Sequence, residues 1–522
     1  MTSKYFHAAA YHPDESEVLK AYQGINPKKL DFRLSTVTVQ TKGTFQPYLM
    51  AVWIKIASVF KLVKISSSFD YYKANPRELV KLYVTGRSLS IFFGILTVIL
   101  LFFMAKIFYN DYRIGLLSAF LLAITPIHAI WSHYIGTDAL LTFEVCLVFL
   151  LCFYILKNGS NKIYLFTGLL VGLTGATKYS IIPLTLIPVI AHYLSSNKFF
   201  NKKLFLYLLF VPAGFILGNP YSVLEPRCFY ETLKYSSQIN VTVNSVLNPL
   251  DSFGPQPMFL YYLTTAPKYS FGIPLAILFL FGFIFAFIRK EKIDIVIIVW
   301  MIIFYLFIAL SSPWQSMRWQ LPYIPVLCLL SAKSIFVVLE NISKKLKILI
   351  LLIVACISIA TLFYSVAYMK MMTEKDVRDE SSEWIEKNIP EGKKIAVPDV
   401  YFWNPSIVMT NYWYKETEPF YANIKKYKIF QTEWDIKKLE KINPDYVVLA
   451  DYEYYPILKL KDKYPHPELM PFLEEIMQSD RYTLIKKFEK KPKLFGIIPI
   501  GGFFPPEFRM VNPTILIYKK LI

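Results

Sequence analysis

Long apolar runs, separated by short polar connections, make up most of the first 370 residues. Ten of these runs are long enough, or nearly so, to cross about 30 Å of hydrocarbon as α-helices. We expect the spans at residues 88–109, 114–130, 139–157, 163–177, 180–195, 203–218, 271–289, 293–311, 319–339 and 347–369. The pattern predicts a polytopic α-helical membrane protein with a transmembrane domain at residues 1–370.

Residues 371–522 mix polar and apolar positions and contain no run of spanning length. Residues 376–388 follow the period of an amphipathic helix. Short β-branched and aromatic runs at residues 394–398, 444–450 and 514–518 are typical of strands. We therefore expect a small α/β domain at residues 371–522.

Three shorter segments outside the spans also read as helices. Residues 16–24 follow Asp14 and Glu15, whose carboxylates suit a helix N-terminus. Residues 47–63 are apolar but contain two lysines, which favours a helix lying in the membrane interface. A similar segment lies near residues 257–265, inside the long connection at 219–270.

Composition and charge support this interpretation. Hydrophobic residues are 55% of 522, and the mean hydropathy is +0.39, whereas a soluble chain is nearer to about 45–50% apolar. Short basic connections alternate with connections that are poor in Lys and Arg, and the basic ones are expected in the cytoplasm. The basic connections are residues 157–162, 198–203, 289–292 and 344–347, and the basic-poor ones are residues 131–138, the turn at 177–179, 219–270 and 311–318. The net charge of +19 is thus largely topological and does not indicate a nucleic-acid partner.

The same alternation places residues 1–86 and the domain at 371–522 outside the cytoplasm, on a multi-pass plasma-membrane protein. Only 11 residues precede His12, which is too few for a span. Either the N-terminus is translocated unaided or a first span is missing from this chain, and we expect the second. Four of the five cysteines fall in predicted spans, so a disulfide framework is not expected.

The acidic pair Asp14-Glu15 is the strongest candidate for chemistry, because adjacent carboxylates beside apolar helices are usually functional. Outside the cytoplasm, where ATP and nucleotide sugars are absent, its substrate has to be supplied through the membrane. A lipid-linked donor meets that need.

Inverting transfer from a sugar phosphate requires a base for the acceptor and positive charge for the leaving phosphate. Asp14 is the candidate base, unless it caps a helix. Glu15 could orient the acceptor, bind a divalent cation or be a solvated charge.

Four cations occur near outer ends of spans or in outer loops, namely Lys42, Arg87, Lys178 and Arg318. Together they could bind the donor phosphate, or each could only extend to lipid headgroups. Asp138 heads a span, either as a cap or as a second carboxylate in the cavity. His12, Glu15 and His133 could hold a divalent metal, although no dense ligand spacing supports one. No other cofactor is indicated.

Several motifs in one order carry a family resemblance. They are His12-Pro-Asp-Glu15, Thr41 to Tyr48, Gly136-Thr-Asp138, Thr177-Lys-Tyr179, Arg318-Trp-Gln-Leu-Pro322 and Arg378 to Pro390, with Arg87 at the opening of a span. With these motifs the chain resembles the GT-C superfamily of membrane glycosyltransferases, in the branch of protein O-mannosyltransferases and lipid A aminoarabinose transferases. The segment at Thr41 to Tyr48 departs from the family's pattern at its prolines.

The resemblance implies transfer of a hexose or pentose from a polyprenyl-phosphate donor to an outer acceptor. That acceptor could be a protein, a lipid or a cell-wall glycan. From a different class, a polytopic transporter or flippase of lipid-linked saccharides would share the hydropathy. A transporter would be expected to carry charges at mid-span, broken helices or repeats. In this sequence the candidate charges gather at outer ends instead.

Overall fold

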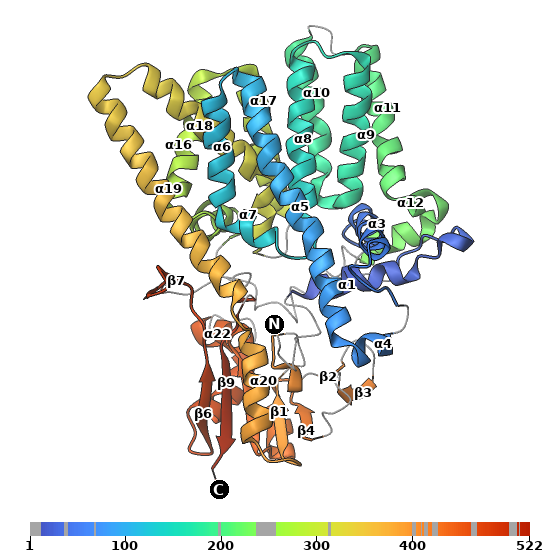
Figure 1. Ribbon diagram of the computed structural model, residues 1–522, viewed down its shortest axis with the longest axis vertical. Helices are drawn as coiled ribbons and strands as arrows, with labels where there is room; N and C mark the ends of the chain where they lie inside the picture. The colour runs from blue at the N-terminus through green and yellow to red at the C-terminus, as the bar shows by residue number, and fades with distance from the viewer. Residues whose placement is uncertain are drawn as a thin grey trace.

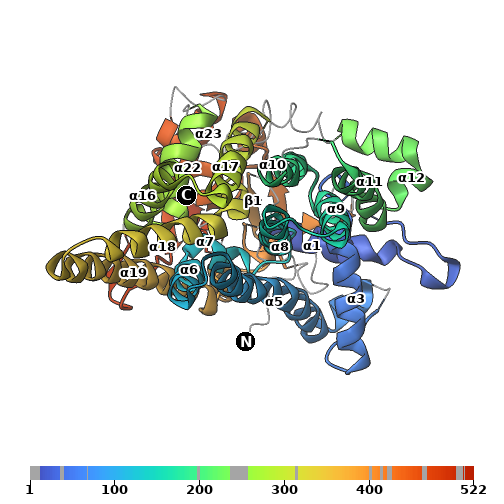
Figure 2. The ribbon, with the colours of Figure 1, turned by 90° about the horizontal axis from the view of Figure 1, so that it is seen from above.

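A computed structural model gives the arrangement of the chain (Figure 1). It describes residues 12–35, 40–66, 69–196, 200–235, 257–311, 315–398, 403–408, 410–411, 416–419, 426–460, 467–500, 509–510 and 512–521. A helical bundle occupies one part of the molecule, and a small sheet with its helices lies beyond one end of it (Figures 1 and 2). The structure is therefore mostly helical with a C-terminal sheet, as the sequence predicts.

Helices occur at all ten predicted positions. They are α5 (Pro76–Tyr109), α6 (Tyr112–Ile124) with α7 (Pro126–Trp131), α8 (Asp138–Leu156), α9 (Asn161–Thr177), α10 (Leu186–Ser195), α11 (Lys202–Gly218), α16 (Ile273–Arg289), α17 (Lys292–Ser311), α18 (Ile324–Glu340) and α19 (Lys344–Thr373). Among the described residues, five helical stretches are long and apolar enough to span a membrane: 77–109, 138–156, 292–310, 317–340 and 344–388. Their length and composition support an integral membrane protein.

Prolines account for three local departures from the predicted helices. The second predicted span breaks before Pro126, because proline lacks an N–H and restricts the residue that precedes it. The fifth begins as a 3₁₀ helix, η3 (Tyr179–Thr185), which contains Pro183. The ninth also begins as a 3₁₀ helix, η5 (Met317–Tyr323), which contains Pro322. These breaks turn the backbone at the ends of helices, where the candidate residues lie.

Helix α5 begins earlier than the sequence pattern indicates. Its 34 residues measure about 51 Å, well beyond the thickness of hydrocarbon. Arg87 consequently lies about three turns inside the helix instead of opening it. The same region also contains α1 (Pro13–Ala21), η1 (Tyr22–Gly24), η2 (Pro27–Lys29), α3 (Phe45–Val59) and α4 (Phe69–Ala74).

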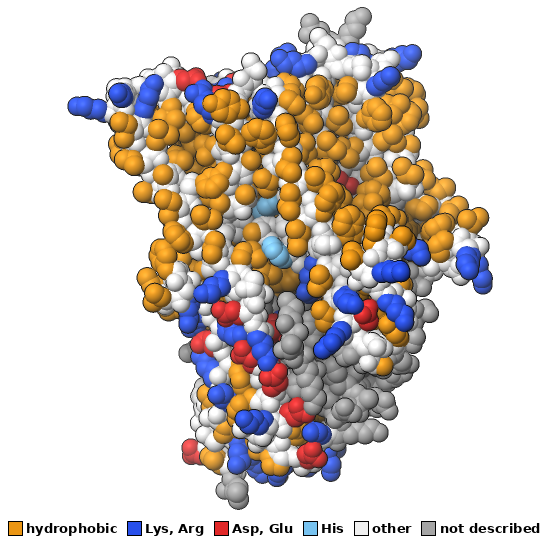
Figure 3. All heavy atoms as spheres, viewed as in Figure 1, with side chains coloured by type: hydrophobic (Ala, Val, Ile, Leu, Met, Phe, Trp, Pro, Cys, Tyr) orange, Lys and Arg blue, Asp and Glu red, His pale blue; other side chains and the backbone are white. Residues whose placement is uncertain are grey.

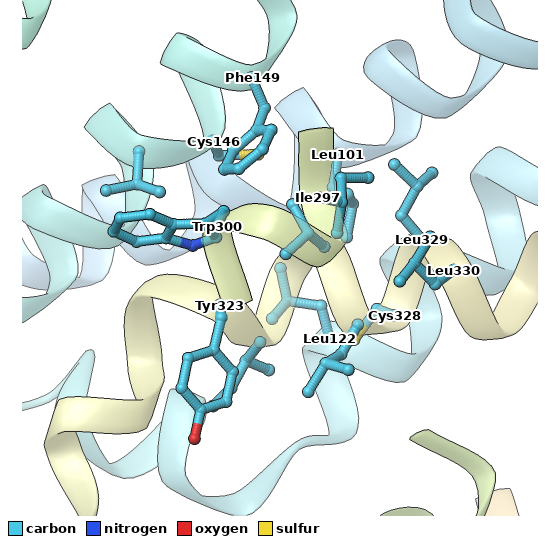
Figure 4. Packing of buried hydrophobic residues seen from close by; sticks show 14 of the residues in the cluster. Leu101, Leu122, Cys146, Phe149, Ile297, Trp300, Tyr323, Cys328, Leu329 and Leu330 are labelled. Atoms are coloured by element: carbon cyan, nitrogen blue, oxygen red, sulfur yellow. The ribbon is translucent and has the colours of Figure 1, made fainter. Parts of the chain in front are cut away.

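The surface of the bundle shows a broad apolar belt with Lys and Arg along its upper rim (Figure 3). Connections between α8 and α9, between α16 and α17, and between α18 and α19 lie at that rim, opposite the C-terminal sheet (Figure 1). Inside the bundle, Trp300 of α17 stacks on Phe304 with 4.6 Å between ring centroids, and Phe149 of α8 packs on Trp300 (Figure 4). These large buried rings join helices that are distant in sequence into one core.

Helix α3 exposes a row of apolar side chains. Val52, Ile56 and Val59 are 47–69% exposed, while Met50 and Ile54 on the opposite face are buried. That division agrees with the expected interfacial helix at residues 47–63. The other expected segment forms α14 (Met258–Leu260), a π-helical turn η4 (Tyr261–Thr265) and α15 (Ala266–Ser270). Residues 236–256 of the same connection lie outside the described residues.

The C-terminal sheet has the strand order β4-β1-β5-β9-β6. Its strands are β1 (Lys394–Val397), β4 (Lys428–Gln431), β5 (Tyr446–Ala450), β6 (Tyr482–Phe488) and β9 (Ile515–Lys520). Strand β1 is parallel to β4 and β5, whereas β9 is antiparallel to β5 and β6. Two short pairs lie outside it, β2 (Thr410–Asn411) with β3 (Glu416–Pro419) and β7 (Lys493–Leu494) with β8 (Ile498–Pro499).

Helices cover both faces of this sheet. Helix α20 (Val377–Asn388) packs on one face, and α21 (Ile436–Ile442), α22 (Asp451–Leu460) and α23 (Met470–Met477) contribute to the core on the other. The helix at 376–388 and the three predicted strands are all present within a few residues. Short apolar runs thus located β1, β5 and β9, whereas β4 and β6 of the same sheet were not predicted.

Candidate functional site

The acidic motif begins helix α1, which lies at the end of the bundle nearest the C-terminal sheet (Figure 1). His12 is the N-cap, and its Nδ1 accepts a hydrogen bond from the Asp14 N–H at 3.2 Å. Pro13 occupies the first helical position, which needs no N–H donor. The side chain of Asp14 is therefore not the cap of this helix, and its carboxylate is available for other partners.

Asp14 is held between two cations from distant parts of the chain. Lys42 Nζ lies 2.5 Å from its Oδ1, and Arg318 Nη1 lies 2.8 Å from its Oδ2. Arg318 comes from η5, 304 positions further along the chain. Burial alone would raise the pKa of Asp14, but Lys42 and Arg318 hold it well below its usual range. Asp14 is consequently an ionised carboxylate in this state.

Glu15 has a different role in the structure. Its side chain is fully buried and accepts two hydrogen bonds from Arg87, at 2.7 Å from Nε and 2.8 Å from Nη2. The backbone N–H of Ile135 adds a third at 3.2 Å. This paired arrangement ties α1 to α5 and to the connection before α8. The position of Asp14, one residue earlier, depends on that attachment.

A second carboxylate and cation lie nearby. Lys178, which follows α9, donates to Asp138 at the start of α8 across 2.8 Å. Burial lowers the pKa of Lys178, Asp138 opposes this shift, and the charge of Arg318 reinforces it. Arg318 therefore lies close enough to influence both the Asp14 and the Asp138 pairs. The two pairs form one electrostatic cluster.

Backbone contacts hold the two lysines together. The N–H of Tyr179 donates to the carbonyl of Lys42 at 3.0 Å, and the N–H of Thr44 donates to the carbonyl of Ala176 at 2.9 Å. Gly43 permits this approach, because a Cβ at that position would lie 2.3 Å from the Thr177 carbonyl oxygen. Segments 42–44 and 176–179 thus form one wall of the site.

The possible metal site is not supported by the side-chain positions. Glu15 is bound to Arg87, and His133 Nδ1 lies 2.6 Å from the carbonyl oxygen of Ala129. His12 packs against Trp131 with 5.0 Å between ring centroids, and burial lowers its pKa to about 4. Within the described part of the chain, no three His, Cys, Asp or Glu side chains are grouped to hold a metal ion. The described side chains therefore do not bring His12, Glu15 and His133 together as a ligand set.

Aromatic residues line the cluster in a way that the sequence did not reveal. The guanidinium of Arg318 lies 5.0 Å from the ring centroid of Trp131, and Lys178 lies 5.5 Å from that of Trp319. Tyr134 packs against His12, and its hydroxyl is buried with no hydrogen-bond partner within the described residues. Only the chain's folding brings these rings to the cations.

Seven of the predicted residues therefore belong to one cluster, and their pairing restricts their chemistry. The members are Asp14, Lys42, Asp138, Lys178 and Arg318, joined to the Glu15–Arg87 pair through adjacent Asp14. Four cations face three carboxylates, so an added anion would meet a net positive site. Lys42, Arg318 and Lys178 are 14–35% exposed at their side chains. Arg87 directs both Nε and Nη2 to Glu15, which makes it the least available of the four.

Part of the chain matches a known protein family. Residues 83–221 match the family described as dolichyl-phosphate-mannose-protein mannosyltransferase. This match confirms the resemblance to the mannosyltransferase branch that the motifs predicted. No curated protein matches the chain.

Solved structures of low sequence identity also align with it. ArnT from Cupriavidus metallidurans bound to undecaprenyl phosphate is 11% identical over 98% of this chain and 95% of its own, with a TM-score of 0.46. The apo form of ArnT is 13% identical over 87% and 92%, with a TM-score of 0.45. The oligosaccharyltransferase AglB from Archaeoglobus fulgidus, in complex with an inhibitory peptide and a dolichol-phosphate, is 11% identical over 88% and 67%, at 0.45. Likeness of this size does not by itself establish a shared activity.

Proposed function

We propose that this protein is a membrane glycosyltransferase that moves a sugar from a polyprenyl-phosphate donor to an acceptor on the outer face of the membrane. One observation carries the proposal. Asp14 is held by Lys42 and Arg318, beside the Lys178–Asp138 pair, at one end of an apolar bundle. A carboxylate among cations at a membrane surface suits the two needs of transfer from a lipid phosphate. The family match over residues 83–221 supports the same class of reaction.

Asp14 acts as the base that removes the proton from the acceptor hydroxyl. With Lys42 and Arg318 bound, its low pKa makes it a weak base. A donor phosphate would compete for these cations and add a negative charge beside the carboxylate. Both effects raise the pKa of Asp14, so the base becomes stronger when the donor is in place. Asp14 thus becomes an effective base only in the complex with the donor.

The cations stabilise the phosphate that leaves as the sugar is transferred. Arg318 can bind two phosphate oxygens at once, whereas Lys42 and Lys178 act as point charges. Asp138 keeps Lys178 in the site and is the second carboxylate of the cavity. If the deprotonated acceptor attacks directly from the side of the anomeric carbon that faces away from the phosphate, transfer inverts that carbon. Glu15 and Arg87 serve as positioning residues that hold α1 in place.

The proposal includes a topology. The ten predicted spans cross the plasma membrane, with the basic connections in the cytoplasm and the site and the domain at 371–522 outside. Exposed apolar residues of α3 then rest in the outer interface, where a polyprenyl chain would approach. The acceptor is a protein, a lipid or a cell-wall glycan.

The test of this activity uses membranes that contain the protein. They are incubated with radiolabelled polyprenyl-phosphate hexoses and pentoses, and the labelled product is identified. Transfer of label to an endogenous protein, lipid or glycan is expected, with a loss in membranes from cells without the protein. If the labelled lipid is only moved between leaflets and no covalent product forms, the flippase alternative is correct and the proposal is wrong.

A further inference from the structure

A pocket of about 110 Å³ lies beside the proposed site and has no part in the mechanism above. A water molecule takes about 30 Å³ in the liquid, so the space holds several waters and is on the scale of one sugar ring. Its walls come from Arg33, Leu34 and Gln40, from α3 with the preceding Thr44, from the turn after α9, and from residues 219–232. Tyr48, Tyr179, Tyr221 and Phe229 supply aromatic surface around it.

The pocket and the proposed site share one wall. Lys178 has an extended backbone (φ −154°, ψ 116°), so its side chain and that of Tyr179 point to opposite sides. Lys178 reaches Asp138, whereas Tyr179 lines the pocket. On the facing segment, Lys42 reaches Asp14, whereas Thr44 lines the pocket. A ligand in the pocket would therefore lie one layer of backbone away from the reacting groups.

The polar groups of the pocket are neutral except at its rim. Asn219 is buried and donates to the Tyr179 hydroxyl at 2.9 Å, which leaves the proton of that hydroxyl for another acceptor. Arg33 and Glu225 pair across 3.4 Å at the rim, where both are well exposed. Aromatic faces with hydroxyl, amide and carboxylate groups suit a sugar ring, which offers apolar C–H faces and a rim of hydroxyls. Phosphate would not suit it, because Arg33, the cation among the lining residues, is already paired with Asp31 and Glu225.

We propose that this pocket binds a sugar ring of the acceptor, which makes the acceptor a carbohydrate chain. That the bound sugar belongs to the acceptor rests on the proposed function. That the pocket binds a sugar ring does not. The transferred sugar of the donor has to meet Asp14 and the phosphate, and the shared wall keeps the pocket away from both. The pocket therefore holds a second ring, one that the acceptor already carries.

A cysteine in the native chain reports on occupancy. Cys228 is exposed and lines the pocket, while Cys356 is exposed on α19 and belongs to a predicted span. The rate of alkylation at each is followed by mass spectrometry in the full-length protein. The probes are the methyl glycosides of mannose, glucose and N-acetylglucosamine, used up to about 0.1 M because one ring binds weakly. At least one glycoside should slow alkylation at Cys228 severalfold without changing Cys356.

This experiment does not depend on turnover, so it remains decisive if the transferase assay fails. Equal rates at Cys228 with all three glycosides would overturn the proposal. So would protection by an uncharged Ser/Thr-rich peptide but by none of the glycosides, because the pocket would then hold peptide. If a glycoside protects Cys228 but the transferase assay shows no activity, the pocket still binds a sugar. Only the claim that this sugar belongs to the acceptor is then rejected.

Matched variants test that link when the transferase is active. Glu225→Gln alters the rim, and Glu231→Gln changes an exposed carboxylate nearby that does not line the pocket. Phe229→Ala removes an aromatic wall, and Tyr230→Ala removes its exposed neighbour. Each pocket variant should raise KM for a glycan acceptor by about five- to tenfold, with KM for the donor and kcat unchanged. A rise in the donor's KM instead, or equal effects of the control variants, would show that the pocket does not hold the acceptor.

Discussion

Replacing Glu15 by Gln should loosen helix α1 more than any other single change in the acidic motif. Glu15 accepts two hydrogen bonds from Arg87 and one from the backbone of Ile135, and its side chain is fully buried. A glutamine keeps one acceptor oxygen, so at least one bond to Arg87 is lost and an amide N–H then faces the guanidinium. Hydrogen bonds to charged groups contribute about 1.5–3 kcal/mol, and breaking a buried pair costs about 3–5 kcal/mol.

Water moderates this cost, because the Arg87 side chain is 19% exposed. We therefore expect a loss of about 3 kcal/mol, which corresponds to a roughly hundredfold larger opening constant for α1. Hydrogen–deuterium exchange of peptides covering residues 13–21, measured in nanodiscs, reads that constant directly. The matched control is Glu17→Gln, since Glu17 pairs with Lys20 at 3.5 Å on the same helix and such pairs contribute about 0.2–0.5 kcal/mol.

Exchange in Glu15→Gln that stays within about threefold of the native rate would contradict the positioning role. An equal increase in Glu17→Gln would show that any lost charge loosens the helix. Combining Glu15→Gln with Arg87→Gln should restore part of the protection, because the unpaired guanidinium is then removed. A catalytic role for Glu15 predicts the reverse pattern, with lost turnover and normal exchange.

Three further predictions concern the cations, the pH response and the topology. Arg318→Gln should raise KM for the polyprenyl-phosphate donor about ten- to hundredfold in a donor titration, whereas Arg318→Lys should keep part of the binding. A KM for the donor that is the same in Arg318→Gln and in the native protein would contradict a phosphate site. Burial lowers the pKa of His12 to about 4, below its ordinary 6.5, so the unfolded chain binds more protons between these values. Stability should therefore fall by as much as roughly 3 kcal/mol as pH is lowered from 6.5 to 4, measured by exchange in α1, and His12→Gln should abolish that fall. Cysteines introduced at Ser196 and Glu391 should be labelled from opposite sides of the membrane, and labelling from one side would reject the topology.

The sequence predicted where helices and strands lie better than it predicted which side chains contact one another. Apolar runs of spanning length need only local information, so helices such as α8 and α17 could be predicted within a few residues. Strand β5 was equally visible as a short apolar run. Pro126 also indicated a helix break in the sequence, but hydropathy averaged over a whole span does not show the effect of one proline. The early start of α5 was missed because its first turns are polar.

The site shows the other limit. Motifs on one side of the membrane predicted that Asp14 and Arg318 would be neighbours, but not that they would form a pair. Glu15 illustrates why. Its residue type suits a metal, an acceptor or a solvated position, and only folding places Arg87, 72 positions away, against both of its oxygens. Trp131 and Tyr134 were missed for the same reason, since an aromatic residue near a span usually indicates only the interface.

The Asp14→Asn variant tests the central claim most directly. Asparagine has nearly the same shape but cannot accept a proton, so turnover with a radiolabelled polyprenyl-phosphate sugar should fall roughly a hundredfold or more. Donor binding should remain, because Lys42 and Arg318 are still present and are released from Asp14. Exchange in α1 serves as the control for folding, since His12 and not Asp14 caps that helix. The account predicts a folded protein that binds donor and does not turn over, whereas turnover at the native rate would remove Asp14 from catalysis and contradict it.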